Sequence, residues 1–489
     1  MDYSFLKSGT DVRGYASDLG GNKVELTDSA VTDITAAFAV WCSRRFGKPT
    51  NSLKIAVGHD SRITADRISS AVKSALVSAG VTVLDCGLAS TPAMFMTTVD
   101  LSTDAAVQIT ASHHPFDRNG LKFFLPTGGL EGSEISEILN IAASGEKITA
   151  GGGSVTATDY MSIYAQGLRN KIIAAVGNGN FPLKGFHIVV DAGNGAGGFY
   201  ATEVLEKLGA DISGSQFLEP DGMFPNHIPN PENKAAMESI CNAVKASGAD
   251  LGVIFDTDVD RAGCVDKNGT EINRNRLIAL AAHIALDGNE GGTVVTDSVT
   301  SDGLKKYIEE TLGGSHYRYR RGYKNVIDKA IELCNDGTNC PLAIETSGHA
   351  ALRENYFLDD GAYLVTKIII ELAKGSDFEQ LLKPLEMPAE EREVRIDITA
   401  ADFRSYGNTV IEKLTEFVTD NPKYTVASDN REGIRVSTEN GWFLLRLSVH
   451  DPVMPLNFES KKVGGVDADV ADIKPFFEQF DELKLPDNF

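Results

Sequence analysis

One pattern of residues occurs three times in the chain: a short β-branched run, a polar turn, an amphipathic helical stretch, a glycine and a second strand-like run. Within each copy, strand-type residues give way to an apolar rhythm of about 3.6 residues that ends near a glycine, as a right-handed β–α–β crossover requires. The sequence therefore predicts mixed α/β domains with largely parallel sheets. The copies are LKIAVGHDSRITADRISSAVKSALVSAGVTVLDCG (53–87), FHIVVDAGNGAGGFYATEVLEKLGADISG (186–214) and GTVVTDSVTSDGLKKYIEETLGGSHYRYR (292–320).

Polar and glycine-rich stretches near 142–160, 264–276 and 383–393 separate the copies. For 489 residues, a prior of about 150 residues per domain also suggests three or four domains. The last part has strand-like runs such as REVRIDI and GWFLLRLSV and fewer helical patterns, so it is predicted to be a smaller α+β domain. The predicted domains are residues 1–155, 156–268, 269–387 and 388–489.

The net charge of the chain bears on its partners, and its cysteines and apolar runs bear on its cellular compartment. The formal net charge of −22 repels nucleic acid and anionic membranes, but it allows a small anionic substrate where a cleft gathers Arg and Lys. The six scattered cysteines include no C-x-x-C pair and are expected to be reduced thiols. The N-terminus has no apolar signal core, and no run approaches about 18 apolar residues. We expect a cytoplasmic protein, or an organellar one if a transit peptide has been removed.

Ser112 stands in QITASHHPFDRNGLKFF (108–124), after an apolar run and before two histidines. A nucleophile elbow of the G-x-S-x-G type is missing, which argues against a serine hydrolase. Phosphorylation suits this serine better, and a phosphoserine needs cationic neighbours and usually a divalent ion. The plainer alternative is a loop serine that caps a turn.

The stretch LGVIFDTDVDRAGCV (251–265) runs from an apolar strand into three alternate carboxylates, Asp256, Asp258 and Asp260, followed by Arg261. Alternate carboxylates on a loop can converge on one hard cation such as Mg²⁺. An EF-hand is excluded because Arg261 takes the place of the turn glycine and Lys267 that of the bidentate glutamate. The alternative is that these acidic residues bind no ion and only expose the end of the strand to solvent.

The same stretch also resembles the haloacid-dehalogenase phosphotransferases, in which the first aspartate of the motif is the nucleophile. In that interpretation Asp256 would form an acyl phosphate. The third aspartate, the arginine after it and TASHHP upstream argue against it.

Two further stretches carry candidate binding residues. LAIETSGHA (342–350) presents Glu345, Ser347 and His349, whose side chains suit the neighbouring hydroxyls of a sugar, although an ordinary polar turn is the alternative. In LLRLSVHDP (444–452), Arg446 and Ser448 are candidates for a phosphate site, together with Arg435 in GIRVS. Arginines at strand ends are common without such a role.

The glycine-rich DAGNGAGG formally matches a dinucleotide fingerprint at Gly193, Gly195 and Gly198. Asp211 follows Gly198 after only 13 residues, whereas a ribose-binding acid is expected about 20 residues further on. We therefore interpret the glycines as a tight strand-to-helix turn.

The stretches SGTDVRG, TASHHPFDRNGLK, EPDGMFPNHIPNPE, DTDVDRAG, ETSGH and RLSVHDP occur in this order along nearly the whole chain. Together they resemble the α-D-phosphohexomutase family, which includes phosphoglucomutases and phosphomannomutases. The resemblance implies a heart-shaped architecture of four domains, three similar α/β domains and a smaller C-terminal α+β domain. It also implies reversible phosphoryl transfer between hexose 1-phosphate and hexose 6-phosphate through a phosphoserine and a hexose 1,6-bisphosphate, which serves as activator.

The resemblance also assigns roles to residues of this chain. Ser112 would carry the phosphate and bind Mg²⁺ together with Asp256, Asp258 and Asp260. Positive charge at the transferring group would come from Arg13, Lys122 and Arg261, while His113 would orient or shuttle a proton; a role for His114 is less defined. His349 would lie near the reacting phosphate, and the substrate-binding residues would be Glu345, Ser347, Gly348, Lys324, Arg435, Arg446, Ser448 and His450.

Two departures from the family pattern bear on substrate preference. Val449 and His450 replace the Gly-Thr pair that members often carry in the last motif. In RRGYKNVI, Tyr323 replaces the histidine of the Gly-His-x-x-Ile segment that many members carry, and Lys324 follows it. A hexose 1,6-bisphosphate synthase that releases the intermediate, and an inactive sugar-phosphate-binding paralogue, are therefore kept as alternatives. The expected partners are hexose phosphates, and the expected state is a monomer or weak homodimer.

Overall fold

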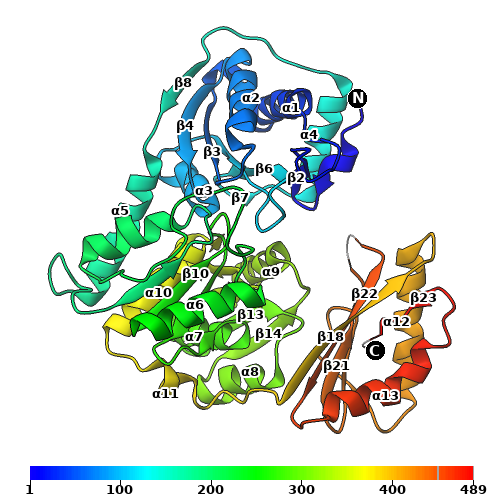
Figure 1. Cartoon of the computed structure of the whole chain (residues 1–489). Helices are drawn as coiled ribbons and strands as arrows, with labels where there is room; N and C mark the ends of the chain where they lie inside the picture. Colours follow the sequence, from blue (N-terminus) through cyan, green and yellow to red (C-terminus); the bar gives the residue numbers. More distant parts are fainter. Residues whose placement is uncertain (449–450, 488) are drawn as a thin grey trace. The chain divides into compact units, whose positions relative to one another are not determined.

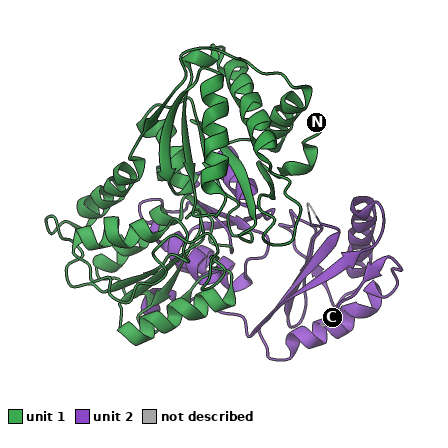
Figure 2. Ribbon diagram, turned by 45° about the horizontal axis from the view of Figure 1, so that its top comes forward, with its two compact units in different colours: residues 1–273, 347–378 green, residues 274–346, 379–489 purple. Residues whose placement is uncertain are grey.

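The structure, a computed structural model, describes residues 1–448, 451–487 and 489 (Figure 1). The chain forms two compact units, which Figure 2 colours separately. Unit 1 comprises residues 1–273 and 347–378, and unit 2 comprises residues 274–346 and 379–489. The division into four domains at the sequence-derived boundaries stays a prediction, and its first boundary, residue 155, falls inside a strand that belongs to the first sheet.

The first sheet of unit 1 has eight strands in the order β1-β2-β6-β5-β3-β4-β8, with β7 paired to β6. Strand β3 runs parallel to both β4 and β5, as the first β–α–β copy predicts, whereas β6 pairs antiparallel with β5. The carboxyl ends of β3 and β5 therefore lie side by side. The strands are β1 (Lys7–Ser8), β2 (Asp11–Tyr15), β3 (Lys54–His59), β4 (Thr82–Leu88), β5 (Ala105–Ile109), β6 (Arg118–Leu125), β7 (Gly128–Gly129) and β8 (Ser154–Ala157).

Side chains alternate along each strand, so each strand contributes residues to both faces of the sheet. Helices cover both of these faces. Ile55 and Val57 of β3 belong to the core that includes residues of α1, α2 and α4. On the opposite face, Gly58 leaves room for Met94 of α3, whose Sδ would lie 2.5 Å from an added Cβ. The helical segments are η1 (Ser4–Leu6), α1 (Asp28–Phe46), η2 (Thr50–Ser52), α2 (Ala65–Ser78), α3 (Thr91–Asp100), α4 (Gly132–Ser144) and α5 (Tyr160–Val176).

The second sheet of unit 1 has the order β12-β11-β10-β9, in which β9 and β10 are parallel and the other pairs antiparallel. A hairpin of β16 and β17, followed by α10, completes the unit. The elements are β9 (Ile188–Asp191), η3 (Tyr200–Leu205), η4 (Glu206–Leu208), α6 (Lys234–Ser247), β10 (Leu251–Phe255), β11 (Ala262–Asp266), β12 (Glu271–Ile272), β16 (Ala350–Leu352), η6 (Arg353–Asn355), β17 (Leu358–Asp359) and α10 (Gly361–Ala373).

The second sequence copy departs from its prediction. Its expected second strand is reduced to two isolated bridges, His187 with Asp211 and Asp191 with Gln216, and its helix is a π-type turn followed by a 3₁₀ turn. The segment after Gly209 is polar (DISGSQ), and its side chains bond to the backbone instead of packing as a strand.

In unit 2, strands β14, β13 and β15 form a parallel group, as the third copy predicts. The elements around them are α7 (Asn275–Leu286), β13 (Thr293–Asp297), α8 (Asp302–Lys306), η5 (Tyr307–Thr311), β14 (Ser315–Tyr319), α9 (Tyr323–Asn335), β15 (Leu342–Ile344) and α11 (Phe378–Leu382), whose first residue is assigned to unit 1.

The C-terminal part of unit 2 is a sheet of order β19-β20-β21-β22-β18-β23 whose pairs are all antiparallel. Its buried face packs with α12 and α13 around Phe443, Leu456 and Phe477. This agrees with the smaller α+β domain expected from the sequence. The elements are β18 (Glu390–Ile398), α12 (Phe403–Thr419), β19 (Thr425–Val426), β20 (Ile434–Ser437), β21 (Gly441–Leu445), β22 (Val453–Ser460), α13 (Gly465–Phe477) and β23 (Leu483–Lys484).

The six cysteines are free thiols, and Cys334 is half-buried while the other five are buried. No helix among the described residues is both long enough and apolar enough to cross a bilayer.

Candidate active site

Ser112 lies in the loop that joins β5 to β6, and only 4% of its surface is exposed. Its φ of 52° is in the left-handed region, which is costly for a residue that carries a Cβ. Hydrogen bonds hold this conformation: the N–H of Ser112 donates to Thr110 Oγ1 at 2.9 Å, and its carbonyl accepts from Arg62. The hydroxyl group is therefore presented by a fixed backbone.

The Ser112 hydroxyl lies between a cation and a carboxylate. Its Oγ accepts a hydrogen bond from Arg261 Nη2 at 2.7 Å and lies 3.4 Å from Asp256 Oδ2, to which it can donate. His113 Nδ1 is 3.3 Å away and also contacts Arg261. The structure thus brings together, within unit 1, four residues that the sequence placed in two distant motifs.

Asp256, Asp258 and Asp260 form a buried acidic triad on the loop between β10 and β11. Each offers a carboxylate oxygen within 4.8 Å of the others, and none is more than 1% exposed. Asp258 Oδ2 accepts from the hydroxyl of Thr91, whereas Asp258 Oδ1 and Asp260 Oδ1 have no hydrogen-bond partner among the described residues. Buried carboxylate oxygens without partners fit a hard cation, which prefers oxygen ligands.

The charges of the triad are unequally compensated. Burial, together with the neighbouring Asp260 and Asp258, raises the pKa of Asp256 well above its ordinary value. Burial also acts to raise the pKa of Asp260, but Lys122, whose Nζ is 3.2 Å away, with His349 and Arg261, lowers it overall. Burial and two neighbouring carboxylates thus disfavour a negative charge on Asp256, and a further cation would offset that charge.

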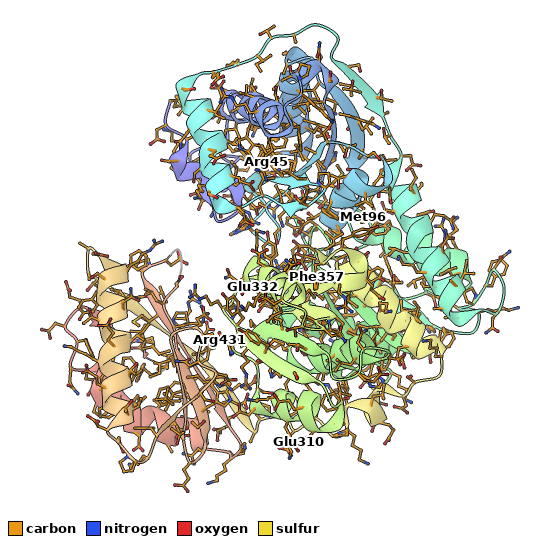
Figure 3. All side chains as sticks on the ribbon, turned by 180° about the vertical axis from the view of Figure 1, so that it is seen from behind. Arg45, Met96, Glu310, Glu332, Phe357 and Arg431 are labelled. Atoms are coloured by element: carbon orange, nitrogen blue, oxygen red, sulfur yellow. The ribbon has the colours of Figure 1, made fainter. Side chains whose placement is uncertain are left out.

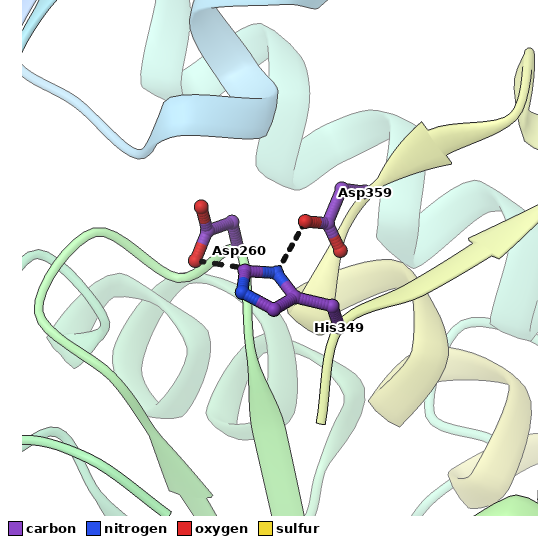
Figure 4. Close-up of side chains that lie close together, drawn as sticks. All are labelled: Asp260, His349 and Asp359. Atoms are coloured by element: carbon purple, nitrogen blue, oxygen red, sulfur yellow. Dashed lines mark hydrogen bonds and ion pairs between the residues drawn. The ribbon is translucent and has the colours of Figure 1, made fainter. Parts of the chain in front are cut away.

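His349 is held between two carboxylates (Figure 4). Its Nδ1 contacts Asp359, at the end of β17, and lies 4.0 Å from Asp260 Oδ1. Burial acts to lower the pKa of the imidazole, but Asp359 and Asp260 raise it overall. His349 thus brings positive charge to the rim of the acidic triad.

The two histidines after Ser112 differ from His349 in their charge. Burial, followed by Arg261, lowers the pKa of His113 to about 2. Burial, followed by Arg13, lowers the pKa of His114 to about 3. Their rings stack with centroids 5.2 Å apart, and both are neutral at pH 7. Arg13 itself, on β2, pairs with Asp11 at 2.7 Å.

The glycine-rich turn supports the acidic loop, in agreement with its interpretation as a tight turn. The N–H of Ala196 donates to the carbonyl of Thr257 at 2.8 Å. A Cβ on Gly195 would lie 2.5 Å from the same oxygen, so only glycine fits there. A dinucleotide site is not needed to explain these glycines.

The remaining predicted binding residues of unit 1 are Ser347 and Gly348, of which Ser347 is buried and Gly348 has a φ of 95°. In unit 2, buried Glu345 accepts from the N–H of Gly322 at 2.6 Å, and Lys324 pairs with Asp328 at 3.0 Å. The Nε atom of Arg446 has no hydrogen-bond partner among the described residues, and Ser448 Oγ accepts from the N–H of Asp451. His450 and Val449 lie outside the described residues.

Arg435 is already engaged within unit 2. Its guanidinium lies 3.5 Å from the ring centroid of Trp442, and it donates to the carbonyl of Ser298 at 3.0 Å and to Asp302 at 2.9 Å. The nearby Arg431 (Figure 3) stacks on Tyr317 at 3.9 Å. These contacts favour a structural role for Arg435, so its assignment as a phosphate ligand stays a prediction.

Sequence reasoning missed Asp60, Arg62, Thr91 and Asp359. Asp60 and Arg62 follow β3 in GHDSR, and Asp359 is the last residue of β17 in FLDDG. Asp60 and Arg62 could have been found from the sequence, because they follow an apolar strand of the same α/β unit as the strand before Ser112. Neighbouring parallel strands end at the same edge of a sheet.

Comparisons with known proteins agree with this geometry. The family model for α/β/α domain I of phosphoglucomutase/phosphomannomutase matches residues 10–149, that for domain II residues 163–269 and that for domain III residues 273–387. The chain is 31% identical over 441 residues to a phosphoglucomutase of Neisseria gonorrhoeae, which covers 89% of this chain and 90% of that protein. It is 30% identical to a phosphomannomutase/phosphoglucomutase of Pseudomonas putida, over 92% of this chain and 94% of that protein.

A crystal structure of a phosphoglucomutase/phosphomannomutase family protein from Burkholderia thailandensis superimposes with a TM-score of 0.79 at 27% identity. The match covers 98% of this chain and 97% of that one. From the three family models and these relatives we conclude that the chain belongs to the phosphoglucomutase/phosphomannomutase family of phosphohexomutases.

Proposed function

We propose that this protein interconverts hexose 1-phosphates and hexose 6-phosphates, with glucose and mannose phosphates as substrates, through phosphorylated Ser112. The observation that carries the proposal is the position of the Ser112 hydroxyl, 2.7 Å from Arg261 Nη2 and 3.4 Å from Asp256 of the acidic triad. Membership of the family and the names of the relatives support the same reaction.

In the first half of the reaction, the bond between phosphorus and Ser112 Oγ breaks as phosphorus bonds to a hydroxyl oxygen of the sugar phosphate. The sugar hydroxyl loses its proton, and the serine oxygen regains one. The second half reverses these steps with the other phosphate of the bisphosphate. Phosphoryl transfer depends on positioning and charge stabilisation, which Arg261, Lys122 and His349 supply. Neutral His113, 3.3 Å from Oγ, orients the hydroxyl.

Asp256, Asp258 and Asp260 would hold Mg²⁺, with an oxygen on Ser112 as a further ligand. When bound, the ion would offset the negative charge of the transferring phosphate. The buried oxygens Asp258 Oδ1 and Asp260 Oδ1, which accept no hydrogen bond among the described residues, support this assignment. A hexose 1,6-bisphosphate would act as activator by phosphorylating Ser112.

The other residues of the proposal orient the substrate. Arg13 adds positive charge beside the two neutral histidines. Glu345 and Ser347 bind sugar hydroxyls, while Arg446 and Ser448 hold the phosphate that does not react. Gly348, Lys324 and His450 complete the proposed binding set.

Replacement of Ser112 by Ala tests the proposal. We expect the wild-type protein to convert glucose 1-phosphate and mannose 1-phosphate in the presence of Mg²⁺ and a catalytic trace of the bisphosphate. Ser112→Ala should lose this activity while Ser78→Ala, on the exposed side of α2, retains it. Full activity of Ser112→Ala would refute the proposal. Accumulation of bisphosphate would indicate a synthase, and binding without turnover by the wild type an inactive paralogue.

A further inference from the structure

Arg62 is a fully buried arginine that none of the proposed catalytic steps uses. It follows β3 by three residues and precedes α2, and its side chain has no exposed surface. A buried guanidinium is costly unless its donors and its charge are satisfied. The partners of the Arg62 side chain therefore indicate its role in the structure.

The guanidinium of Arg62 makes four hydrogen bonds, three to backbone carbonyls of the Ser112 loop and one to the carbonyl of the first residue of β6. Its Nη1 donates to the carbonyls of Pro115 at 2.7 Å and Arg118 at 2.9 Å. Its Nη2 donates to the carbonyls of His114, at 2.7 Å, and of Ser112 itself. One planar group thus binds the loop and the start of β6 at four points.

Asp60 completes this arrangement from the same turn. Its Oδ2 lies 3.3 Å from Arg62 Nε and accepts from Thr110 Oγ1 at 2.7 Å. Thr110 Oγ1 in turn accepts from the N–H of Ser112 at 2.9 Å. Ser112 is therefore tied at its N–H through Thr110 to Asp60 and at its carbonyl to Arg62, on either side of its left-handed backbone.

The segment 221–224 covers the same turn. Gly222 packs so closely on it that a Cβ would lie 2.3 Å from the N atom of Ile63 and 2.5 Å from the carbonyl oxygen of Ser61. The ring centroid of Phe224 lies 5.4 Å from the guanidinium carbon of Arg62. The segment therefore packs against the turn that carries Arg62 and against its guanidinium.

We propose that Arg62 is a positioning residue for phosphoryl transfer: its guanidinium fixes the carbonyls of the Ser112 loop so that Oγ faces Arg261 and the acidic triad. The inference rests on the proposed function, which it deepens. A lysine cannot replace this arginine, because an ammonium group has three donors at one point, whereas the guanidinium presents a rigid planar fork.

Steady-state kinetics of Arg62→Lys test the proposal. A misplacement of about 1 Å at a reacting group costs about 100-fold in rate, so we expect kcat for glucose 1-phosphate to fall by about that factor. KM should stay within about threefold, because no proposed substrate ligand changes. Arg67→Lys is the matched control, since Arg67 also donates to backbone carbonyls, those of Ala16 and Leu26, but to none in the Ser112 loop, and should retain wild-type kcat.

Equal kcat in Arg62→Lys and the wild type would overturn the proposal. So would a loss confined to KM. If Arg62→Lys does not fold, Asp60→Asn keeps the guanidinium but removes its charge partner, and the same loss of kcat at unchanged KM is expected of it. Wild-type kcat in folded Asp60→Asn would then count against the proposal.

A second readout does not depend on mutase activity. In a Ser112→Cys background, the rate of thiol alkylation at position 112 by iodoacetamide reports how often the loop opens. We expect Arg62→Lys to raise this rate at least about tenfold, with labelling of half-buried Cys334 unchanged as an internal control. Equal labelling at position 112 would overturn the positioning role. If the wild type had no mutase activity, the proposed function would be refuted. The alkylation rates at position 112 with and without Arg62→Lys would still test whether Arg62 positions the loop.

Discussion

Asp258 contributes one of three buried carboxylates that repel one another, and one of its oxygens has no partner among the described residues. We expect saturating Mg²⁺ to raise the melting temperature of the wild type, since a ligand at about 100 times its Kd stabilises by about 2.7 kcal/mol. Asp258→Asn should lose this rise and should melt higher than the wild type in EDTA, because the repulsion is smaller.

Thermal unfolding in EDTA and in MgCl₂ measures both effects. Asp211→Asn, at an exposed carboxylate of unit 1, is the control and should keep the wild-type response. A full Mg²⁺ shift in Asp258→Asn would contradict the assignment of this residue to the cation site.

The site residues that could be predicted from sequence share a motif. Asp256, Asp258 and Asp260 alternate after one strand, so their convergence follows from local geometry. The contact of Arg62 with the Ser112 loop joins the segments that follow β3 and β5, and the contact of Asp359 with His349 joins the two ends of the β16–β17 hairpin. Such contacts depend on which strands are neighbours in the sheet, and the sequence does not state that order.

At the scale of elements, the turn after β9 supports the acidic loop through backbone contact. Gly195→Ala would place its Cβ 2.5 Å from the carbonyl oxygen of Thr257 and 2.8 Å from its Cα. We expect a loss of about 1–3 kcal/mol in the free energy of unfolding, as for other overpacked sites, together with weaker Mg²⁺ binding. Denaturant unfolding and Mg²⁺ titration measure the two effects.

Gly167→Ala is the matched control for this substitution. Gly167 lies within α5, and an added Cβ would meet no atom within 4 Å. Alanine there should raise stability by about 0.5–1 kcal/mol, because glycine is a poor helix former. Equal free energies of unfolding for Gly195→Ala and Gly167→Ala would contradict the inference that the turn packs closely on the acidic loop.

Element prediction from sequence succeeded where the pattern was long and apolar. The first copy gave β3, α2 and β4 in the expected parallel order, and Glu390–Ile398 and Gly441–Leu445 became strands of the C-terminal sheet. It failed in the second copy, where the polar segment after Gly209 makes only isolated bridges. Strand β8 lies in the separator predicted near 142–160: its residues SVTA show no apolar alternation, and in the structure all four are exposed.

For the whole molecule, the stability of unit 1 should depend on pH through Asp360. This buried carboxyl caps α10 and accepts from the hydroxyl of Tyr164 on α5 at 2.7 Å. Burial raises its pKa from 3.8 to about 6. A carboxyl whose pKa is higher in the folded state contributes its full stability below pH 4, and the contribution is lost as the pH rises through 6.

Between pH 4 and pH 7, Asp360→Asn should therefore gain stability relative to the wild type, by about 2 kcal/mol at 1.36 kcal/mol per pKa unit. Urea unfolding followed by Trp41 fluorescence, with Trp442→Phe in both proteins, reports on unit 1 alone. A difference in free energy that stays constant from pH 4 to pH 7 would contradict a raised pKa at Asp360.

The most direct test of the account follows the phosphoryl group itself. The protein is incubated with glucose 1,6-bisphosphate labelled in both phosphates and is then freed of ligand. One portion is digested and searched for labelled peptides. A second portion is mixed with unlabelled glucose 1-phosphate and quenched within one turnover. Label should appear on Ser112 and should pass to the sugar in the second portion. Label on Asp256, or label on Ser112 that never reaches the sugar, would contradict the proposed transfer through Ser112.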